Sequence, residues 1–316
     1  HYSAYDSIVA HKLMFPSSTP DRVISNLTTD PAHSLAVNWR TDQQVSNGVV
    51  EIALATDGPE FLVRNVKKVN AISEKFENQN RNEPLVKATY HSAIVNNLNP
   101  NTVYEYRVGN GSKDNGYWSE WFQYKTANIG NKKPFSFIYF GDAQNDVKSL
   151  WSRVIRNSYR QFPQVNFMLH AGDLINDRDA NLECGECFYA CSFIHATVPS
   201  MMTPGNHEYR NGVLSSLWRP QFTLPENGPT EALKETCFAI DYQNMKLISF
   251  KEIKGSKDIK IGAHCGDYIV DFSPSSLPKD MLSFIELGDK ALSIANDLIV
   301  SQQHIIPVEE ITLNAP

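Results

Sequence analysis

The chain has 316 residues, which is enough for two or three domains. Its composition, with 41% hydrophobic and 20% charged residues, is typical of globular proteins. A formal net charge of −6 without a basic stripe argues against nucleic-acid binding. Because the sequence has no run of 18 uncharged apolar residues, we expect no membrane span and no membrane partner.

Residues 1–19 are expected to form an N-terminal extension, and residues 20–127 have the pattern of an all-β domain. Apolar and polar residues alternate over residues 35–39, which predicts a half-buried strand. Residues 98–104 resemble the corner of fibronectin-type sandwiches, where a tyrosine hydroxyl hydrogen-bonds to the backbone. We expect a sandwich of roughly seven strands, with another small β domain as the alternative. Further strand candidates lie at residues 49–55, 93–95, 103–108 and 118–124.

The pattern changes after residues 128–134, a polar linker marked by glycine and proline. Apolar residues at helical spacing in residues 147–159 predict a helix between the first and second of three buried strands. Such an alternation of strands and helices predicts a mainly parallel α/β sheet, here in a domain at residues 134–244. The three strands are predicted at residues 135–140, 165–171 and 198–202.

A short polar motif follows each of these strands. The motifs are Gly141-Asp142, Gly172-Asp173-Leu174 and Gly205-Asn206-His207-Glu208. Because parallel strands end at one edge of a sheet, we expect Asp142, Asp173 and Asn206 to converge there. Oxygen ligands of this kind bind divalent cations, and two cations ~3.5–4 Å apart can clamp a phosphate and activate water. A single Gly-Asp pair is more typical of a simple turn, but the order and spacing of all three motifs favour a phosphoesterase site.

Residues from about 20 to 244 resemble the purple acid phosphatase branch of the calcineurin-like metallophosphoesterases. The resemblance implies a fibronectin-type sandwich followed by an α/β domain of the four-layer sandwich type. It also implies an acid phosphatase that hydrolyses small phosphate esters, in which a hydroxide activated by two metal ions (Fe, Mn or Zn) attacks phosphorus. A secreted, periplasmic or cell-surface location is expected from the same resemblance, and the oligomeric state stays open.

The resemblance also assigns roles to the motif residues. Asp142 would bind the first metal, Asp173 would bridge both metals, and Asn206 would bind the second metal and touch the phosphate. His207 would lie over the substrate and donate a hydrogen bond or a proton to the leaving oxygen. The alternative role of His207 is to support Asn206.

The chain departs from the family pattern at several ligand positions. Asn176 replaces the tyrosine that binds Fe(III) in the purple enzymes, so no charge-transfer colour is expected. Gln144 stands where many phosphoesterases have a histidine ligand. The later histidine and the Gly-His-x-His motif have no counterpart after Glu208, where only His264 and His304 remain, and we interpret both as surface or turn residues.

These departures make metal occupancy doubtful. We therefore expect weak metal binding and low or no turnover for the chain alone. A non-catalytic binding or adhesion module with a relic phosphoesterase site is the alternative function. A partner chain that supplies the absent ligands is a third interpretation.

Residues 245–316 resemble the small α+β N-terminal domain of fumarylacetoacetate-hydrolase-like proteins. The resemblance runs from the Met-Lys-Leu strand at residues 245–247 to the Leu-x-Ala-Pro segment at residues 313–316, and it contains no catalytic motif. We interpret the whole as a fused or truncated chain: a β domain, the first half of a phosphoesterase domain, and this small segment.

Cys184, Cys187 and Cys191 cluster between the second and third motifs. A zinc site would need a fourth ligand, for which His195 is the nearest candidate. A disulfide in an exported protein, or buried thiols, is the favoured interpretation.

Overall fold

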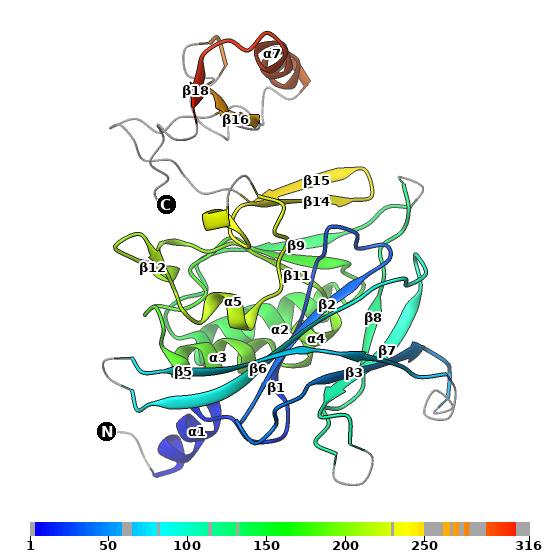
Figure 1. Cartoon of the computed structure of the whole chain (residues 1–316), viewed down its shortest axis with the longest axis vertical. Coiled ribbons are helices and arrows are strands. Elements are labelled where there is room, and N and C mark those ends of the chain that lie inside the picture. Colours follow the sequence, from blue (N-terminus) through cyan, green and yellow to red (C-terminus); the bar gives the residue numbers. More distant parts are fainter. Residues whose placement is uncertain are drawn as a thin grey trace.

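The computed structural model describes residues 4–58, 65–80, 83–112, 116–130, 133–228, 231–249, 262–265, 268–271, 275–277 and 289–307. A short helix, α1 (Ala4–Met14), leads into a two-sheet β-sandwich, and an α/β part follows (Figure 1). None of the described helices is both long and apolar enough to cross a bilayer.

The sandwich has the two-sheet architecture predicted from the sequence. One sheet has the strand order β4-β3-β7-β8, and the other contains β5-β6-β2-β1. The predicted tyrosine corner is confirmed, because the backbone N–H of Asn99 donates to the Tyr104 hydroxyl at 2.7 Å. The strands are β1 (Asp21–Asn26), β2 (Leu35–Thr41), β3 (Val49–Leu54), β4 (Lys67–Asn70), β5 (Ile72–Asn78), β6 (Val86–Val95), β7 (Val103–Gly109) and β8 (Phe122–Lys125).

The strand predicted at residues 35–39 is confirmed as part of β2, but the predicted half-burial is wrong, because every position of β2 is buried. Its apolar face, which includes Trp39, packs in the sandwich core. Its polar face lies against later parts of the chain, where the Asn38 side chain donates to the carbonyl of Pro220 at 3.4 Å. On the same face, the buried Arg40 guanidinium binds both carboxylate oxygens of Asp21, at 2.9 and 2.7 Å. Polar alternation therefore marks a contact between two parts of the molecule here.

The α/β part has the predicted parallel strands in the order β9-β10-β11. A π-helical turn at Val147–Trp151 continues into α2, where one helix was predicted. A small hairpin, β12–β13, follows the third motif. The elements are β9 (Phe137–Phe140), α2 (Ser152–Gln161), β10 (Phe167–His170), α3 (Asn181–Cys191), α4 (Phe193–Thr197), β11 (Ser200–Met202), β12 (Tyr209–Arg210), β13 (Val213–Leu214), α5 (Trp218–Gln221), β14 (Phe238–Tyr242) and β15 (Met245–Ser249).

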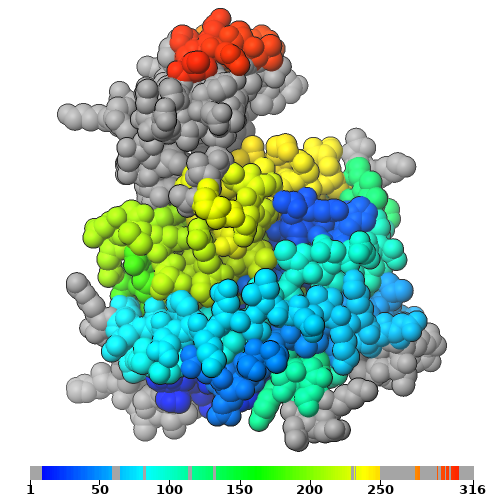
Figure 2. All heavy atoms as spheres, in the orientation of Figure 1, coloured from blue at the N-terminus to red at the C-terminus, as the bar shows by residue number. Residues whose placement is uncertain are grey.

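The two parts of the molecule share one sheet, which the sequence did not predict. β1 of the sandwich pairs with β11 in parallel at Asn26 and Ser200, and this pairing joins both parts into a seven-stranded sheet. The Asn26 side chain reinforces the junction by donating to the Ser200 carbonyl at 3.0 Å. Ile24 and Tyr90 of the sandwich belong to the same buried core as Phe167 of β10. In the space-filling view, the sandwich (blue to cyan) lies directly against the later segments (green to yellow) (Figure 2).

The last strand of this sheet, β9, leaves apolar side chains exposed. Phe137 and Tyr139 are 42% and 66% exposed. Next to them, Tyr242 of the β14–β15 hairpin packs on Phe167, with ring centroids 4.5 Å apart. Among the described residues, the hairpin therefore covers only part of this face.

The residues after 244 divide into two kinds of structure. β15 pairs with β14 along its whole length, so the boundary predicted between residues 244 and 245 falls in the turn of one hairpin. Beyond residue 249, the described strands β16 (Gly262–Cys265), β17 (Tyr268–Asp271) and β18 (Ile305–Pro307) form a three-stranded sheet, and α7 (Asp289–Val300) is the described helix there. His264 lies within β16, whereas His304 is exposed in a turn, as predicted.

Candidate functional site

The three motifs lie at the C-terminal edge of the parallel strands, where the sequence predicts them. His170 of β10 pairs with Phe140 of β9 on one side and with Met202 of β11 on the other, so the three strands end level. Asp142, Asp173 and Asn206 follow these ends. Their ligand roles stay predictions.

Backbone contact holds the second and third motif loops together. A Cβ atom on Gly172 would lie 2.4 Å from the Gly205 nitrogen, and one on Gly205 would lie 2.3 Å from Oδ1 of Asp173. Gly172 also has a φ of +92°, which only glycine adopts readily. A side chain therefore does not fit at Gly172 or at Gly205, because the loops of the second and third motifs contact each other at these two glycines.

Glu208 locks the same two loops through three backbone donors. Its buried carboxylate accepts the N–H groups of Gly205 at 2.7 Å, Asp173 at 2.9 Å and Leu174 at 2.8 Å. Burial raises the pKa of Glu208, and the three N–H donors oppose that shift by stabilising the charged form. The sequence placed Glu208 in a motif but did not reveal this role.

The metal-ligand candidates differ in exposure. Asp173 is 8% exposed, and its Oδ1 accepts the backbone N–H of His207 at 2.8 Å. Asp142 and Asn206 are exposed. Asp142 and Asp173 both have a φ of +51°, a left-handed conformation that aspartate tolerates better than most residues. The buried carboxylate thus follows the central strand of the three, and exposed oxygen donors follow its neighbours.

The ring of His207 is oriented by a backbone carbonyl. Its Nδ1 lies 2.6 Å from the carbonyl oxygen of Asn176. A carbonyl can only accept, so Nδ1 carries the proton and Nε2 of the neutral ring carries the lone pair. Asn176 drew attention in the sequence through its side chain, as a replacement for tyrosine. In the structure it is the main-chain carbonyl of Asn176 that contacts His207, and a sequence pattern does not predict such a contact.

Gln144 is a further candidate oxygen donor, because its backbone contacts Asp173. Its backbone N–H donates to the Asp173 carbonyl at 2.9 Å, and its side-chain Oε1 is buried without a hydrogen-bond partner among the described residues. A buried orphan oxygen is costly unless a cation or a water binds it. Gln144 thus joins Asp142, Asp173 and Asn206 as a candidate donor.

This donor set fits a metal site only in part. Side-chain oxygens suit a hard divalent cation, but the described residues contain no group of three or more His, Cys, Asp or Glu side chains that could hold a metal. Within the described part of the chain, no imidazole completes this set of oxygen donors as the family resemblance implies. The residues therefore fit one oxygen-coordinated cation better than a complete two-metal centre.

The cysteine cluster is not part of this site. Cys184, Cys187 and Cys191 are buried and unpaired on α3, which agrees with the interpretation as buried thiols. Burial raises the pKa of the Cys184 thiol to about 12, which disfavours the thiolate that zinc requires. His195 is buried as well, and burial lowers its pKa, but no metal-binding group forms around it within the described part of the chain.

Two protein-family models match the chain. The model described as the purple acid phosphatase N-terminal domain matches residues 20–126, and that described as calcineurin-like phosphoesterase matches residues 135–240. Neither extends to residues 245–316, so these matches do not support the resemblance to fumarylacetoacetate-hydrolase-like proteins.

Curated relatives are similar over part of their length. Acid phosphatase type 7 of Danio rerio is 32% identical over 145 residues, covering 45% of this chain and 30% of the relative. Acid phosphatase type 7 of Homo sapiens is 25% identical over 257 residues, covering 81% and 52%. "Probable inactive purple acid phosphatase 1" of Arabidopsis thaliana is 25% identical over 177 residues, covering 52% and 28%. The chain therefore spans about half or less of these relatives' length.

A solved structure shares the fold. The purple acid phosphatase PPD1 from yellow lupin (Lupinus luteus) seeds aligns with a TM-score of 0.60 and 18% sequence identity. The alignment covers 76% of this chain and 47% of the lupin chain. At this identity the similarity shows the fold alone.

Proposed function

We propose that this chain belongs to a metal-dependent hydrolase of small phosphoric esters, because residues 20–126 match the model of the purple acid phosphatase N-terminal domain and residues 135–240 match that of the calcineurin-like phosphoesterases. The observation that carries the proposal is the setting of Asp173. Its backbone N–H is held by Glu208, its Oδ1 by the N–H of His207, and it lies between the strand ends that carry Asp142 and Asn206.

Each residue of the site has a separate role in the proposed reaction. A divalent cation held by Asp142, Asp173 and Asn206 would neutralise charge on the phosphate and activate water. Glu208 keeps the second and third loops in contact, so the Asp173 carboxylate has one direction. His207, fixed through Nδ1, offers Nε2 to the substrate. Once protonated, Nε2 can donate to the leaving oxygen.

We propose that hydrolysis by these 316 residues alone is weak. Oxygen donors without imidazoles bind two transition-metal ions poorly, since imidazole is a favoured ligand for zinc and iron. A secreted or cell-surface location and the possibility of oligomers remain proposals based on the family resemblance.

The test is hydrolysis of p-nitrophenyl phosphate by the purified chain with added Mn²⁺. We expect low turnover that Asp173→Asn abolishes. Asp241→Asn, an exposed carboxylate on β14, is the matched control and should leave turnover unchanged. Equal turnover in the parent and in Asp173→Asn would contradict the assignment of the site. Tight binding of two metal ions per chain would contradict the proposed weakness.

The second candidate is a non-catalytic binding or adhesion module with a relic site. The observation that favours it is that, among the described residues, no imidazole joins the oxygen donors of the site. An absence of turnover together with an absence of Mn²⁺ binding would support it. Turnover that appears only with a second polypeptide would instead favour a partner that supplies the absent ligands.

A further inference from the structure

We infer that the β-sandwich positions His207 through residues 176–181, which form the end of the loop between β10 and α3 and the first residue of α3. The side chains that reach this loop come from β5 and the residues just after it, about a hundred positions earlier in the sequence. A role of these contacts in catalysis rests on the proposed function, whereas the positioning of His207 by the sandwich does not.

One peptide unit links the loop to His207. The peptide that joins Asn176 to Asp177 is held at both ends: its carbonyl binds Nδ1 of His207 at 2.6 Å, and its N–H donates to the Glu183 carboxylate at 2.8 Å. The same carboxylate oxygen accepts the N–H of Asn176 at 2.8 Å. Rotation of this peptide would therefore release both the loop and the imidazole.

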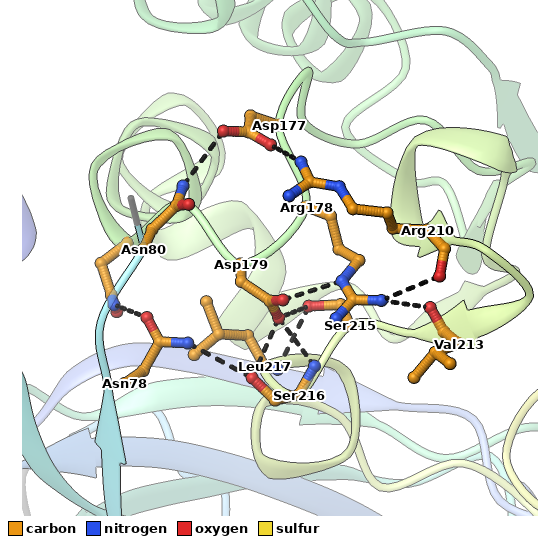
Figure 3. A network of polar contacts seen from close by, with 11 residues as sticks. Asn78, Asn80, Asp177, Arg178, Asp179, Arg210, Val213, Ser215, Ser216 and Leu217 are labelled. Carbon is orange, nitrogen blue, oxygen red and sulfur yellow. Dashed lines mark hydrogen bonds and ion pairs between the residues drawn. The ribbon is translucent and has the colours of Figure 1, made fainter. Parts of the chain in front are cut away.

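The Asp177 side chain ties this peptide to the sandwich. Its Oδ2 accepts the side-chain amide of Asn80 at 3.1 Å, and its Oδ1 accepts the Arg210 guanidinium at 2.6 Å (Figure 3). Asn80 lies just after β5, and Arg210 lies in β12, directly after the third motif. Asp177 thus connects the sandwich, the second motif loop and the third motif hairpin at one point.

A second link runs in parallel through Asp179. Its Oδ1 accepts the Ser215 hydroxyl at 2.8 Å and the Ser216 backbone N–H at 2.7 Å (Figure 3). The Ser216 hydroxyl donates to the same oxygen and accepts the amide of Asn78, the last residue of β5, at 3.2 Å. The side-chain oxygen of Asn78 in turn accepts the Asn181 amide at 2.7 Å.

Glu83 completes the contact by capping α3. Its carboxylate accepts the backbone N–H groups of Asn181 at 2.7 Å and Leu182 at 3.0 Å, the first two residues of the helix. A carboxylate at a helix N-terminus satisfies donors that have no partner within the helix. Asn78, Asn80 and Glu83 therefore bind consecutive parts of the segment that begins at Asp177.

A charge swap between positions 80 and 177 tests the inference. Asn80→Asp replaces the amide donor by a carboxylate that faces the Asp177 carboxylate. In the double variant with Asp177→Asn, the new amide donates to the new carboxylate, and its oxygen still accepts from Arg210. Asn70→Asp, at the exposed end of β4, is the matched control.

The readouts are the tautomer of the His207 imidazole, from nitrogen NMR shifts of the neutral ring, and the hydrogen-exchange rates of the Asn176 and Asp177 amides. The parent and Asn70→Asp should show Nδ1-protonated His207 and slow exchange. Asn80→Asp should mix the tautomers and speed exchange about tenfold, as expected for loss of a hydrogen bond to a charged group. The double variant should restore both.

An unchanged tautomer in Asn80→Asp overturns the inference, whether or not exchange accelerates. Failure of the double variant to restore the tautomer also overturns it, because the effect would then not arise from this contact. p-Nitrophenyl phosphate turnover is measured on the same proteins. A change of tautomer in Asn80→Asp without any turnover in the parent would refute the proposed function and leave the inference standing. Turnover in the parent without a change of tautomer in Asn80→Asp would overturn the inference and leave the proposed function standing.

Discussion

Acidification should destabilise this protein through two buried histidines. His170 and His195 are 3% and 2% exposed, and their ring centroids lie 5.4 Å apart. Both ring nitrogens of His195 lack a hydrogen-bond partner among the described residues. Burial lowers the pKa of both rings, to about 4 for His170, and the nearby His170 lowers the pKa of His195 further.

The sign and size of the effect follow from proton binding. In the unfolded chain histidine titrates near its ordinary pKa of 6.5, so between pH 6.5 and pH 4 the unfolded state binds a proton that the folded state refuses. Stability is therefore present above this window and is lost as the pH falls through it. At pH 5 His170 alone should lower the free energy of unfolding by about 2 kcal/mol, and His195 adds a loss of the same sign.

Urea unfolding followed by tryptophan fluorescence, from about pH 7.5 to about pH 5, measures this loss. His195→Phe removes one titrating ring together with its unpartnered nitrogens. We expect this variant to be more stable than the parent at the acid end, with a shallower dependence on pH. His33→Phe replaces a half-exposed histidine and is the matched control. The same acid slope in His195→Phe and the parent would refute the reasoning.

Three further outcomes follow from single contacts. Glu208→Gln replaces one of the two acceptor oxygens by an NH2 group, so in either orientation of the amide at least one of the three backbone N–H groups faces a donor; thermal denaturation should show a loss of about 2–3 kcal/mol, and an unchanged midpoint would contradict the lock. Tyr104→Phe removes the acceptor of the Asn99 N–H and should cost about 1 kcal/mol in urea unfolding; a loss below experimental error would mean that the corner is not stabilising. Mn²⁺ should raise the melting temperature of the parent but not of Asp173→Asn, and an equal rise in both would place the cation elsewhere.

The local sequence pattern was enough to predict the strands and the helix next to the three motifs. Apolar runs predicted β9, β10 and β11, and helical spacing predicted the helix that begins near Val147. The tyrosine corner was also recognisable, because its donor and acceptor lie five residues apart. Each of these features depends on neighbours in the sequence, and the periodicity of side chains along one element reports them directly.

Contacts between distant residues could not be predicted in the same way. The pairing of β1 with β11 joins Asn26 to Ser200 through backbone atoms, which every residue carries. The carbonyl of Asn176 that orients His207 is also a backbone group, so the identity of residue 176 does not predict this contact. The full burial of β2 was mistaken for half-burial because its polar face is covered by a distant segment.

The sequence by itself predicted the candidate site residues: three strand-end motifs with Asp142, Asp173 and Asn206, and the histidine that follows Asn206. Only the tertiary structure decided how they are held. Glu208 joins two loops through backbone donors, and the sandwich reaches the loop beside His207 across the shared sheet. The physical reason is that motif chemistry resides in side chains, whereas its orientation depends on main-chain groups and on contacts that only folding brings together.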